Sequence, residues 1–188
     1  QQNVSPLIDE KIQKERKALR AHDDLVAMLD NGAEHHDLAP ALQRTHEDGF
    51  TTVSYRMLRL RSIATAARLQ GMGLETGSRI LLSGANHPDW AVAYFGILRA
   101  GMVAVPLDPA LEPAQVETIL ASCDAKAAIL DEPTTLKFKL DIPVAAMSDV
   151  TASDASSSLV APEIRSDDIA SILYTSGTTG IPKGVMLS

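Results

Sequence analysis

The segment RILLSGANHPDWAVAYFGILRAGMVAVPLDP, residues 79–109, changes its hydrophobic period twice. Residues 79–83 form a short apolar run, which is typical of a strand buried on both faces. Pro88 suits the first turn of a helix, and Gly101 ends that helix before residues 102–105 return to an extended apolar run. The segment therefore predicts strand, helix and strand in succession, the repeating unit of a parallel sheet.

The same alternation of patterns continues on both sides of this segment. Helical spacing recurs over residues 54–69 and 113–123, and short extended runs recur over residues 126–130, 143–147 and 169–174. The fold class that we expect is α/β, with helices layered on a largely parallel sheet. Two shorter elements are also expected, a helix over residues 38–45 and a brief strand over residues 51–53.

Length and composition indicate an ordinary globular chain. It has 188 residues, of which 45% are hydrophobic and 22% charged, so it is long enough to bury a core. We expect residues 37–188 to form the main domain, with a Ser-, Ala- and Asp-rich surface loop over residues 148–162. Residues 1–36 form a helical extension, with helical spacing over residues 7–29. The basic middle of that helix suits either a membrane surface or a solvated face, and we favour the solvated face.

Charge and cysteine content exclude several classes of function. The chain carries 17 basic against 24 acidic side chains, and residues 101–188 carry 5 against 12, so no basic stripe for nucleic acid is present. The single cysteine, Cys123, excludes an internal disulfide and a multi-cysteine zinc site. Residues 1–29 lack the apolar core of a secretory signal, and Gly101 and Pro106 divide the longest apolar stretch, so no transmembrane span is expected. We expect a cytoplasmic protein, and peripheral association with a membrane stays open.

Residues 174–185, YTSGTTGIPKGV, combine the groups that hold phosphates. Backbone N–H groups in a tight glycine-rich turn form an anion-binding concavity, hydroxyls add donors, and a lysine adds a mobile positive charge. The spacing differs from that of a Walker A loop, of a dinucleotide fingerprint and of a nucleophile elbow. A triphosphate would use all of these groups together, although a Ser/Thr/Gly-rich structural loop of this composition is also common.

The string YTSGTTGIPKG, residues 174–184, resembles throughout the phosphate-binding signature of the adenylate-forming (AMP-binding) superfamily. This superfamily contains acyl- and aryl-CoA synthetases, adenylation domains of peptide synthetases, and luciferases. Residues 52–108 resemble the N-terminal region of the family, including the turn at residues 77–79. Residues 168–174, which lead into the signature, look most like the long-chain fatty acyl-CoA ligase branch. The likeness covers about residues 38–188.

The resemblance implies a two-step ligase reaction that uses ATP, Mg²⁺ and coenzyme A. A carboxylate, here a fatty acid, attacks the α-phosphate of ATP, and a thiol then takes the acyl group from the adenylate. Lys183 would stabilise the phosphate charge. The residues expected to bind ATP are Thr175, Ser176, Gly177, Thr178, Thr179, Gly180 and Lys183. No metal-ligating side chain is expected. The other working motifs of the family lie beyond this loop and are not found before Ser188, so we expect this chain alone to be inactive.

Three other interpretations stay open beside this one. An adenylation domain that loads an acyl or amino acid onto a carrier protein would share the signature. A non-catalytic nucleotide-binding module would keep the loop without the reaction, and a purely structural domain would show no effect of ATP. The sequence does not assign an oligomeric state.

Four weaker candidates have ordinary structural interpretations. Residues 34–37, EHHD, suit a solvated turn better than a metal site, because adjacent histidines point to different sides. Cys123 suits a buried apolar position rather than a nucleophile. Asp167 and Asp168 suit a loop cap rather than an acid–base pair. Trp90, with its aromatic neighbours four and five residues on, suits core packing rather than base stacking.

Overall fold

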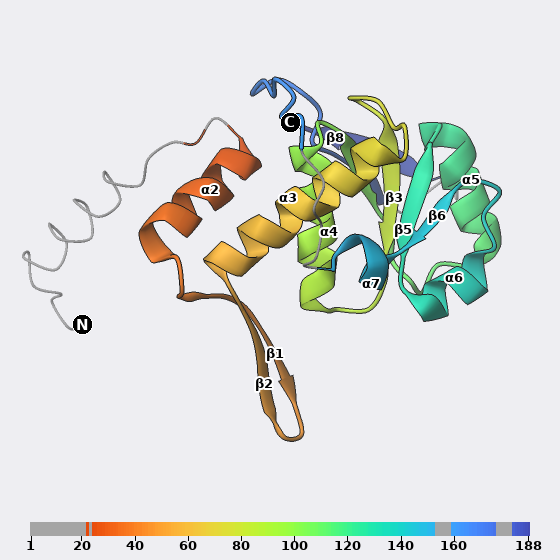
Figure 1. Ribbon diagram of the computed structural model, residues 1–188. Helices are drawn as coiled ribbons and strands as arrows, with labels where there is room; N and C mark the ends of the chain where they lie inside the picture. Colours follow the sequence, from red (N-terminus) through yellow and green to blue (C-terminus); the bar gives the residue numbers. More distant parts are fainter. Residues whose placement is uncertain (1–21, 23, 153–158, 176–181) are drawn as a thin grey trace, which may run out of the picture.

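The structure is a computed structural model that describes residues 22, 24–152, 159–175 and 182–188. Helices and strands alternate along most of this chain (Figure 1). The elements are α2 (Leu25–His36), β1 (Pro40–His46), β2 (Gly49–Ser54), α3 (Tyr55–Gly71), β3 (Arg79–Ser83), α4 (Pro88–Arg99), β4 (Val103–Pro106), α5 (Pro113–Cys123), β5 (Ala127–Leu130), α6 (Glu132–Phe138), β6 (Val144–Ala146), α7 (Met147–Val150), β7 (Ser171–Thr175) and β8 (Lys183–Leu187).

Six strands form the main sheet, in the order β6-β5-β3-β4-β7-β8. All neighbouring pairs are parallel except β7 and β8, which are antiparallel. The chain passes from β3 to β4 on one side and then crosses to β5 on the other side of β3. The predicted α/β fold with a largely parallel sheet is therefore confirmed.

Successive side chains of the central strand enter two separate cores. Ile80 and Leu82 pack with α3, α4 and α7, whereas Leu81 packs with α5 and α6 on the opposite face. All three side chains are fully buried, as the apolar run predicts for a strand covered on both faces. The result is a three-layer arrangement of helices, sheet and helices (Figure 1).

Helix α2 is held on the α3–α4 layer by a partly buried ion cluster. The Arg99 guanidinium on α4 donates to both carboxylate oxygens of Asp30, at 2.5 and 3.0 Å, and also donates to the Ser62 hydroxyl. Arg59 on α3 donates to the same carboxylate at 3.0 Å. Burial raises the pKa of Asp30, but these two guanidinium groups outweigh burial and lower that pKa below its ordinary value of 3.8.

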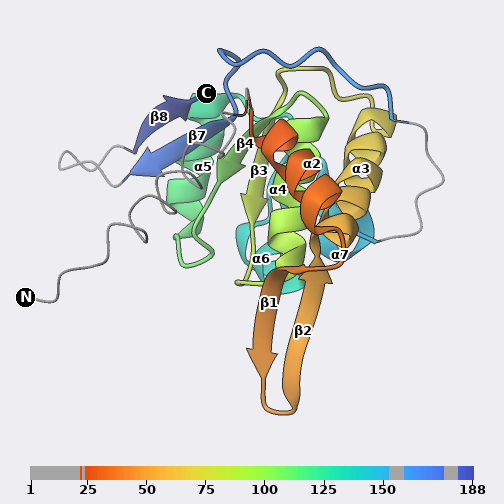
Figure 2. The same ribbon diagram turned by 90° about the vertical axis from the view of Figure 1, so that its left-hand side faces the viewer.

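The expected helix over residues 38–45 is wrong, because the chain there forms strand β1. Strand β1 pairs antiparallel with β2, and the hairpin projects from the body of the molecule (Figures 1 and 2). His46 and Gly49 are partners, so only two residues form the turn, and Gly49 has φ 137°. Pairing with the Thr- and Val-rich β2 satisfies the backbone of β1, and this non-local contact outweighs the local spacing. The Asp48-Gly49 dipeptide is a hairpin signal that indicated this turn.

Other differences concern the extent of the elements. Residues 7–21 and 23 of the expected helix over residues 7–29 lie outside the described residues. Helix α2 begins at Leu25 and continues to His36, so the expected turn at residues 34–37 is instead the end of this helix. Helices α6 and α7 and strand β8 were not expected. Within the described part of the chain, no helix has the length and apolar character that crossing a membrane requires.

Prediction for the ion cluster. Asp30→Asn leaves the Arg99 guanidinium buried without a charged partner, so we expect the free energy of unfolding to fall by about 3 kcal/mol. Because the pKa of Asp30 is lowered in the folded state, the stabilisation is present above pH 3.8 and is lost as the pH falls below it. Urea unfolding between about pH 7 and pH 2 measures both effects. The variant's stability should also depend less steeply on pH in the acid range.

Arg59→Ala is the matched control for this ion cluster. Its side chain contacts the same carboxylate but is 41% exposed, against 9% for Arg99. We expect Arg59→Ala to cost less than about 1 kcal/mol. Equal losses in the two variants would show that burial of Arg99 is not what makes the cluster stabilising.

Prediction for the α3–α4 contact. A Cβ on Gly96 would overlap the Cγ2 and Cβ atoms of Thr65 on α3, so Gly96→Ala must separate these helices. We expect this variant to lose about 1 to 3 kcal/mol of stability, as overpacked cores do. Gly71→Ala is the control, because a Cβ there meets nothing within 4 Å. It should be neutral or stabilising by about 0.5 to 1 kcal/mol in thermal unfolding.

Candidate functional site

The carboxyl ends of the parallel strands meet at one edge of the sheet. Strands β3, β4, β5 and β7 run in the same direction, so Ser83, Pro106, Leu130 and Thr175 all lie at this edge. Open parallel sheets bind their ligands at such an edge. The structure therefore brings the start of the predicted phosphate loop to the side of the sheet where ligand sites form.

Thr175 and Lys183 are cross-strand partners at the ends of β7 and β8. Both residues are exposed, so a hydroxyl and a primary ammonium group are available side by side at the carboxyl edge. The other predicted site residues, Ser176, Gly177, Thr178, Thr179 and Gly180, lie outside the described residues. Their role stays a prediction.

Asp131 joins the two loops that follow β3 and β5. Its carboxylate accepts hydrogen bonds from the Ala85 backbone N–H at 2.7 Å and from the Thr134 backbone N–H at 3.0 Å. Burial raises the pKa of Asp131, but hydrogen bonding from the Thr134 side chain and from these two backbone N–H groups outweighs burial and lowers that pKa below its ordinary value of 3.8. A Cβ on Gly84 would lie 3.0 Å from the Asp131 carboxyl carbon, so the two loops are in close contact.

Two hollows open at this carboxyl edge. One of about 460 Å³ lies between the loops after β3 and β5, where His87, Asp89 and Asp131 line it. The other, of about 810 Å³, lies between strand β1 and the loop after β3, with Arg44 and Trp90 in its walls. The carboxyl edge therefore offers concave space next to the β1–β2 hairpin and between the loops that follow β3 and β5.

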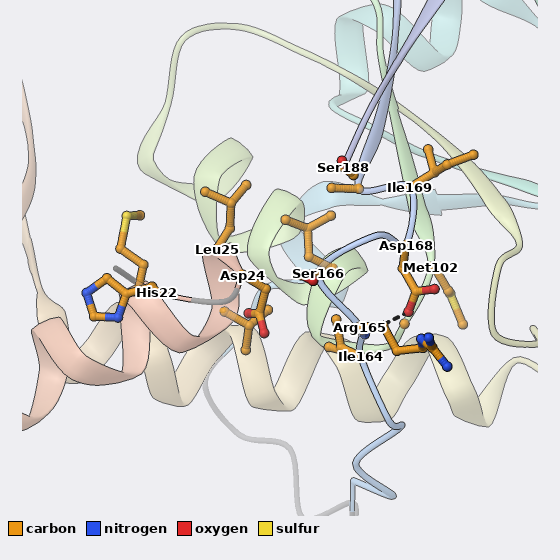
Figure 3. A pocket seen from close by; sticks show the side chains of 15 residues that line it. His22, Asp24, Leu25, Met102, Ile164, Arg165, Ser166, Asp168, Ile169 and Ser188 are labelled. Atoms are coloured by element: carbon orange, nitrogen blue, oxygen red, sulfur yellow. Dashed lines mark hydrogen bonds between the residues drawn. The ribbon is translucent and has the colours of Figure 1, made fainter. Parts of the chain in front are cut away.

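A third pocket, of about 370 Å³, lies at the opposite edge of the sheet (Figure 3). It is lined by the beginning of α2, by Met102 before β4, and by residues 164–166 and 168–170 before β7. The Asp168 carboxylate accepts a hydrogen bond from the Arg165 backbone N–H at 2.9 Å, the dashed line in Figure 3. Asp168 therefore caps a turn, as its position predicted, and it lies far along the strand from the phosphate loop.

The remaining weak candidates have structural roles. Cys123 is buried in the core beneath α5, and burial raises its pKa. His35 Nδ1 lies 2.9 Å from the Asn31 carbonyl, and the His36 ring lies 5.9 Å from the Tyr55 ring. Within residues 22, 24–152, 159–175 and 182–188, no three His, Cys, Asp or Glu side chains gather as a metal site. Trp90 stacks on Tyr94 with ring centroids 5.5 Å apart, packed against the core.

Sequence reasoning missed Asp131 and the wall formed by β1. Asp131 precedes Glu132 and a proline at residue 133, which together are a helix-start signal that indicated α6 and its cap. The Asp48-Gly49 dipeptide indicated the hairpin itself, but no sequence signal placed β1 at the carboxyl edge, because it reaches this edge through tertiary packing of the hairpin.

Residues 29–188 match the model of the family described as AMP-binding enzyme. The match includes the central parallel sheet and the loop between β7 and β8. The chain therefore belongs to the AMP-binding enzyme family, the superfamily that its signature resembles.

Curated relatives include two kinds of enzyme. The long-chain-fatty-acid–CoA ligase of Salmonella typhimurium is 29% identical over 210 residues, which cover 89% of this chain and 37% of the ligase. Pyochelin synthetase PchF of Pseudomonas aeruginosa is 34% identical over 161 residues, which cover 83% of this chain and 8% of the synthetase. The chain thus spans little more than a third of the ligase and a small part of the synthetase.

A solved relative has the same fold. The fatty acyl-adenylate ligase of Legionella pneumophila, solved in complex with acyl adenylate and pyrophosphate, matches with a TM-score of 0.81 and 31% identity. The match covers 89% of this chain and 30% of that protein. The observed sheet with its helices corresponds to the N-terminal subdomain of adenylate-forming enzymes.

Prediction for the loop junction. Asp131→Ala removes the cap of α6 and the acceptor of the Ala85 N–H, so we expect stability to fall by about 1 to 2 kcal/mol. Amide hydrogen exchange at Ala85 and Thr134 should accelerate more than exchange at Ala104 in β4. Asp141→Ala is the control, an aspartate for which the structure gives no cap. Unchanged exchange at Ala85 would show that Asp131 does not hold the two loops together.

Proposed function

We propose that this chain is part of a longer ATP-dependent, AMP-forming acid–thiol ligase that joins a fatty acid to coenzyme A. One observation carries the proposal: Thr175 and Lys183, two residues of the YTSGTTGIPKG signature that are expected to bind phosphate, are partners at the carboxyl edge of the sheet. Membership of the AMP-binding enzyme family supports it. The similarity to a long-chain-fatty-acid–CoA ligase supports the choice of substrate.

In this reaction the carboxylate oxygen attacks the α-phosphate of ATP, and the bond to the bridging oxygen breaks as pyrophosphate leaves. Lys183 would stabilise the negative charge that develops on pyrophosphate, and the Thr175 hydroxyl would donate a hydrogen bond to a phosphate oxygen. Ser176, Thr178 and Thr179 would add hydroxyl donors. A thiol then attacks the acyl carbon of the adenylate, forming the thioester and releasing AMP.

The exposed ammonium group of Lys183 beside the Thr175 hydroxyl fits an anion such as the β- and γ-phosphates. Mg²⁺ would bind to those phosphates and keep several waters, as it does in most nucleotide sites. This chemistry therefore assigns no described side chain to the ion. Coenzyme A would enter as the second substrate, in a cytoplasmic protein.

A second candidate is an adenylation domain that loads an acyl or amino acid onto a carrier protein. The 34% identity to pyochelin synthetase PchF favours it, since this exceeds the 29% identity to the fatty acid ligase. Both candidates perform the same first step at the same loop. We expect residues 1–188 to be inactive alone, and detectable acyl-adenylate formation by them would contradict that.

Prediction for the phosphate site. In ATP–pyrophosphate exchange by the full-length protein, Lys183→Ala should lower the exchange rate about 100-fold, because a charge-stabilising donor is worth about 3 kcal/mol in the transition state. The panel of acids runs from acetate to palmitate, with benzoate and amino acids. Exchange with long fatty acids identifies the fatty acid substrate, and thioester formation with free coenzyme A then supports the CoA ligase. Exchange with one amino acid supports the carrier-loading candidate.

Lys126→Ala is the matched control for this experiment. Lys126 is another exposed lysine, but it pairs with Asp124 at the amino edge of the sheet, before β5. Lys126→Ala should leave the rate of ATP–pyrophosphate exchange within about twofold of wild type. A folded full-length protein that binds ATP but exchanges with no acid would point to a non-catalytic nucleotide-binding module.

A further inference from the structure

Tyr174 lies directly before the predicted phosphate loop, and its ring is held by the body of the domain. The hydroxyl donates a hydrogen bond to the Ser122 Oγ on α5, at 3.0 Å. The half-buried ring packs against the core beneath α5, beside Ile172. Helix α5 therefore holds β7 from one face of the sheet, one residue before Thr175.

The same ring covers Gly184 on the neighbouring strand. Tyr174 and Gly184 are cross-strand partners in the β7–β8 ladder. A Cβ on Gly184 would lie 3.1 Å from the Tyr174 Cζ and 2.9 Å from the Ile172 Cγ2. Glycine is thus needed for the ring to lie across β8, and one side chain holds both strands next to the pair formed by Thr175 and Lys183.

A second tyrosine–serine hydrogen bond holds the opposite end of β7 from the opposite face. The Tyr94 hydroxyl on α4 lies 2.8 Å from the Ser171 Oγ, and Ser171 is buried. Residues 171 and 174 point to opposite faces because side chains alternate along a strand. The two bonds have the same chemistry, but only the bond of Tyr174 lies at the end of β7 where the phosphate loop begins.

We propose that Tyr174, Ser122 and Gly184 form a latch that positions Thr175 and Lys183 for phosphate binding. The latch consists of the Tyr174–Ser122 hydrogen bond and the contact of the Tyr174 ring with Gly184. Tyr174 and Ser122 are positioning residues, since they act through Thr175 and Lys183 rather than on the nucleotide. The expected effect of the latch on catalysis rests on the proposed function. Its expected effect on the order of strands β7 and β8 does not.

The physical reason is preorganisation of the donors. A donor stabilises a developing charge fully only when its position is fixed before the reaction, because reorientation during the reaction costs free energy. Thr175 and Lys183 are exposed and sit at the outer end of a two-stranded ladder on the edge of the sheet. Among the described residues β8 pairs with β7, so without the latch it is this backbone pairing that fixes the end of β8.

The test compares Tyr174→Phe, Ser122→Ala and the double variant in the full-length protein, by ATP–pyrophosphate exchange. Each variant should lower kcat about fivefold, which corresponds to about 1 kcal/mol, with KM for the acid unchanged. The double variant should lose no more than either single variant, because both remove the same bond. Ser122→Thr keeps a hydroxyl and should restore most of the activity.

Tyr94→Phe is the matched control, since it removes the equivalent hydrogen bond at the other end of β7. It should leave kcat within about twofold of wild type, even where its melting temperature falls as much as that of Tyr174→Phe. Gly184→Ala should lower kcat, whereas Val185→Ala at the next exposed position should not. Equal kcat losses in Tyr94→Phe and Tyr174→Phe would overturn the latch, because a general structural role would then explain both.

Amide hydrogen exchange separates this inference from the proposed function. Tyr174→Phe and Ser122→Ala should accelerate exchange in β8 about fivefold, and Tyr94→Phe should not. If the wild-type protein shows no ATP–pyrophosphate exchange, the proposed function is wrong. Amide hydrogen exchange in β8 then decides by itself whether the latch holds the strands. Unchanged amide hydrogen exchange of β8 in both Tyr174→Phe and Ser122→Ala would overturn the latch, whether or not the protein catalyses pyrophosphate exchange.

Discussion

Strand β3 is the element on which the rest of the structure depends. Its backbone pairs with β4 on one side and β5 on the other, and its side chains alternate between the two cores. Parallel neighbours must be joined by crossover connections, which here are helices. Because the side chains of β3 are buried on both faces of the sheet, helices must cover both faces. The same parallel direction gathers the strand ends at one edge. The position of the candidate site therefore follows from how this strand is buried.

The layer of α2, α3 and α4 shows how polar groups are accommodated in such a core. Gly96 lets α4 approach Thr65 on α3 closely, and Arg99 at the end of α4 is then too deeply buried to be left without partners. Asp30 supplies the carboxylate from α2, so the helix that precedes the hairpin is tied to the main domain by charge. Close packing and charge pairing thus depend on each other in this layer.

Local signals predicted most of the elements around β3. Pro88, Gly101 and Pro113 marked helix boundaries that the structure confirms, because proline and glycine restrict or free the backbone wherever they stand. The prediction of a helix over residues 38–45 is wrong because pairing with β2 stabilises an extended chain there, and the spacing within residues 38–45 carries no sign of that partner. Strand β8 was missed for the same reason, since its exposed residues Val185 and Met186 carry no periodicity that distinguishes a paired strand from a loop.

The sequence by itself determined the family, because the signature over residues 174–184 is a contiguous string of backbone-permissive, hydroxyl and cationic residues. It also determined the alternation of strands and helices, which follows from hydrophobic period. Only the tertiary structure decided that Thr175 and Lys183 become partners, and that Ser122, about fifty residues earlier, contacts Tyr174. Such contacts join residues that share no local pattern, and they form only when the sheet and its helices pack together.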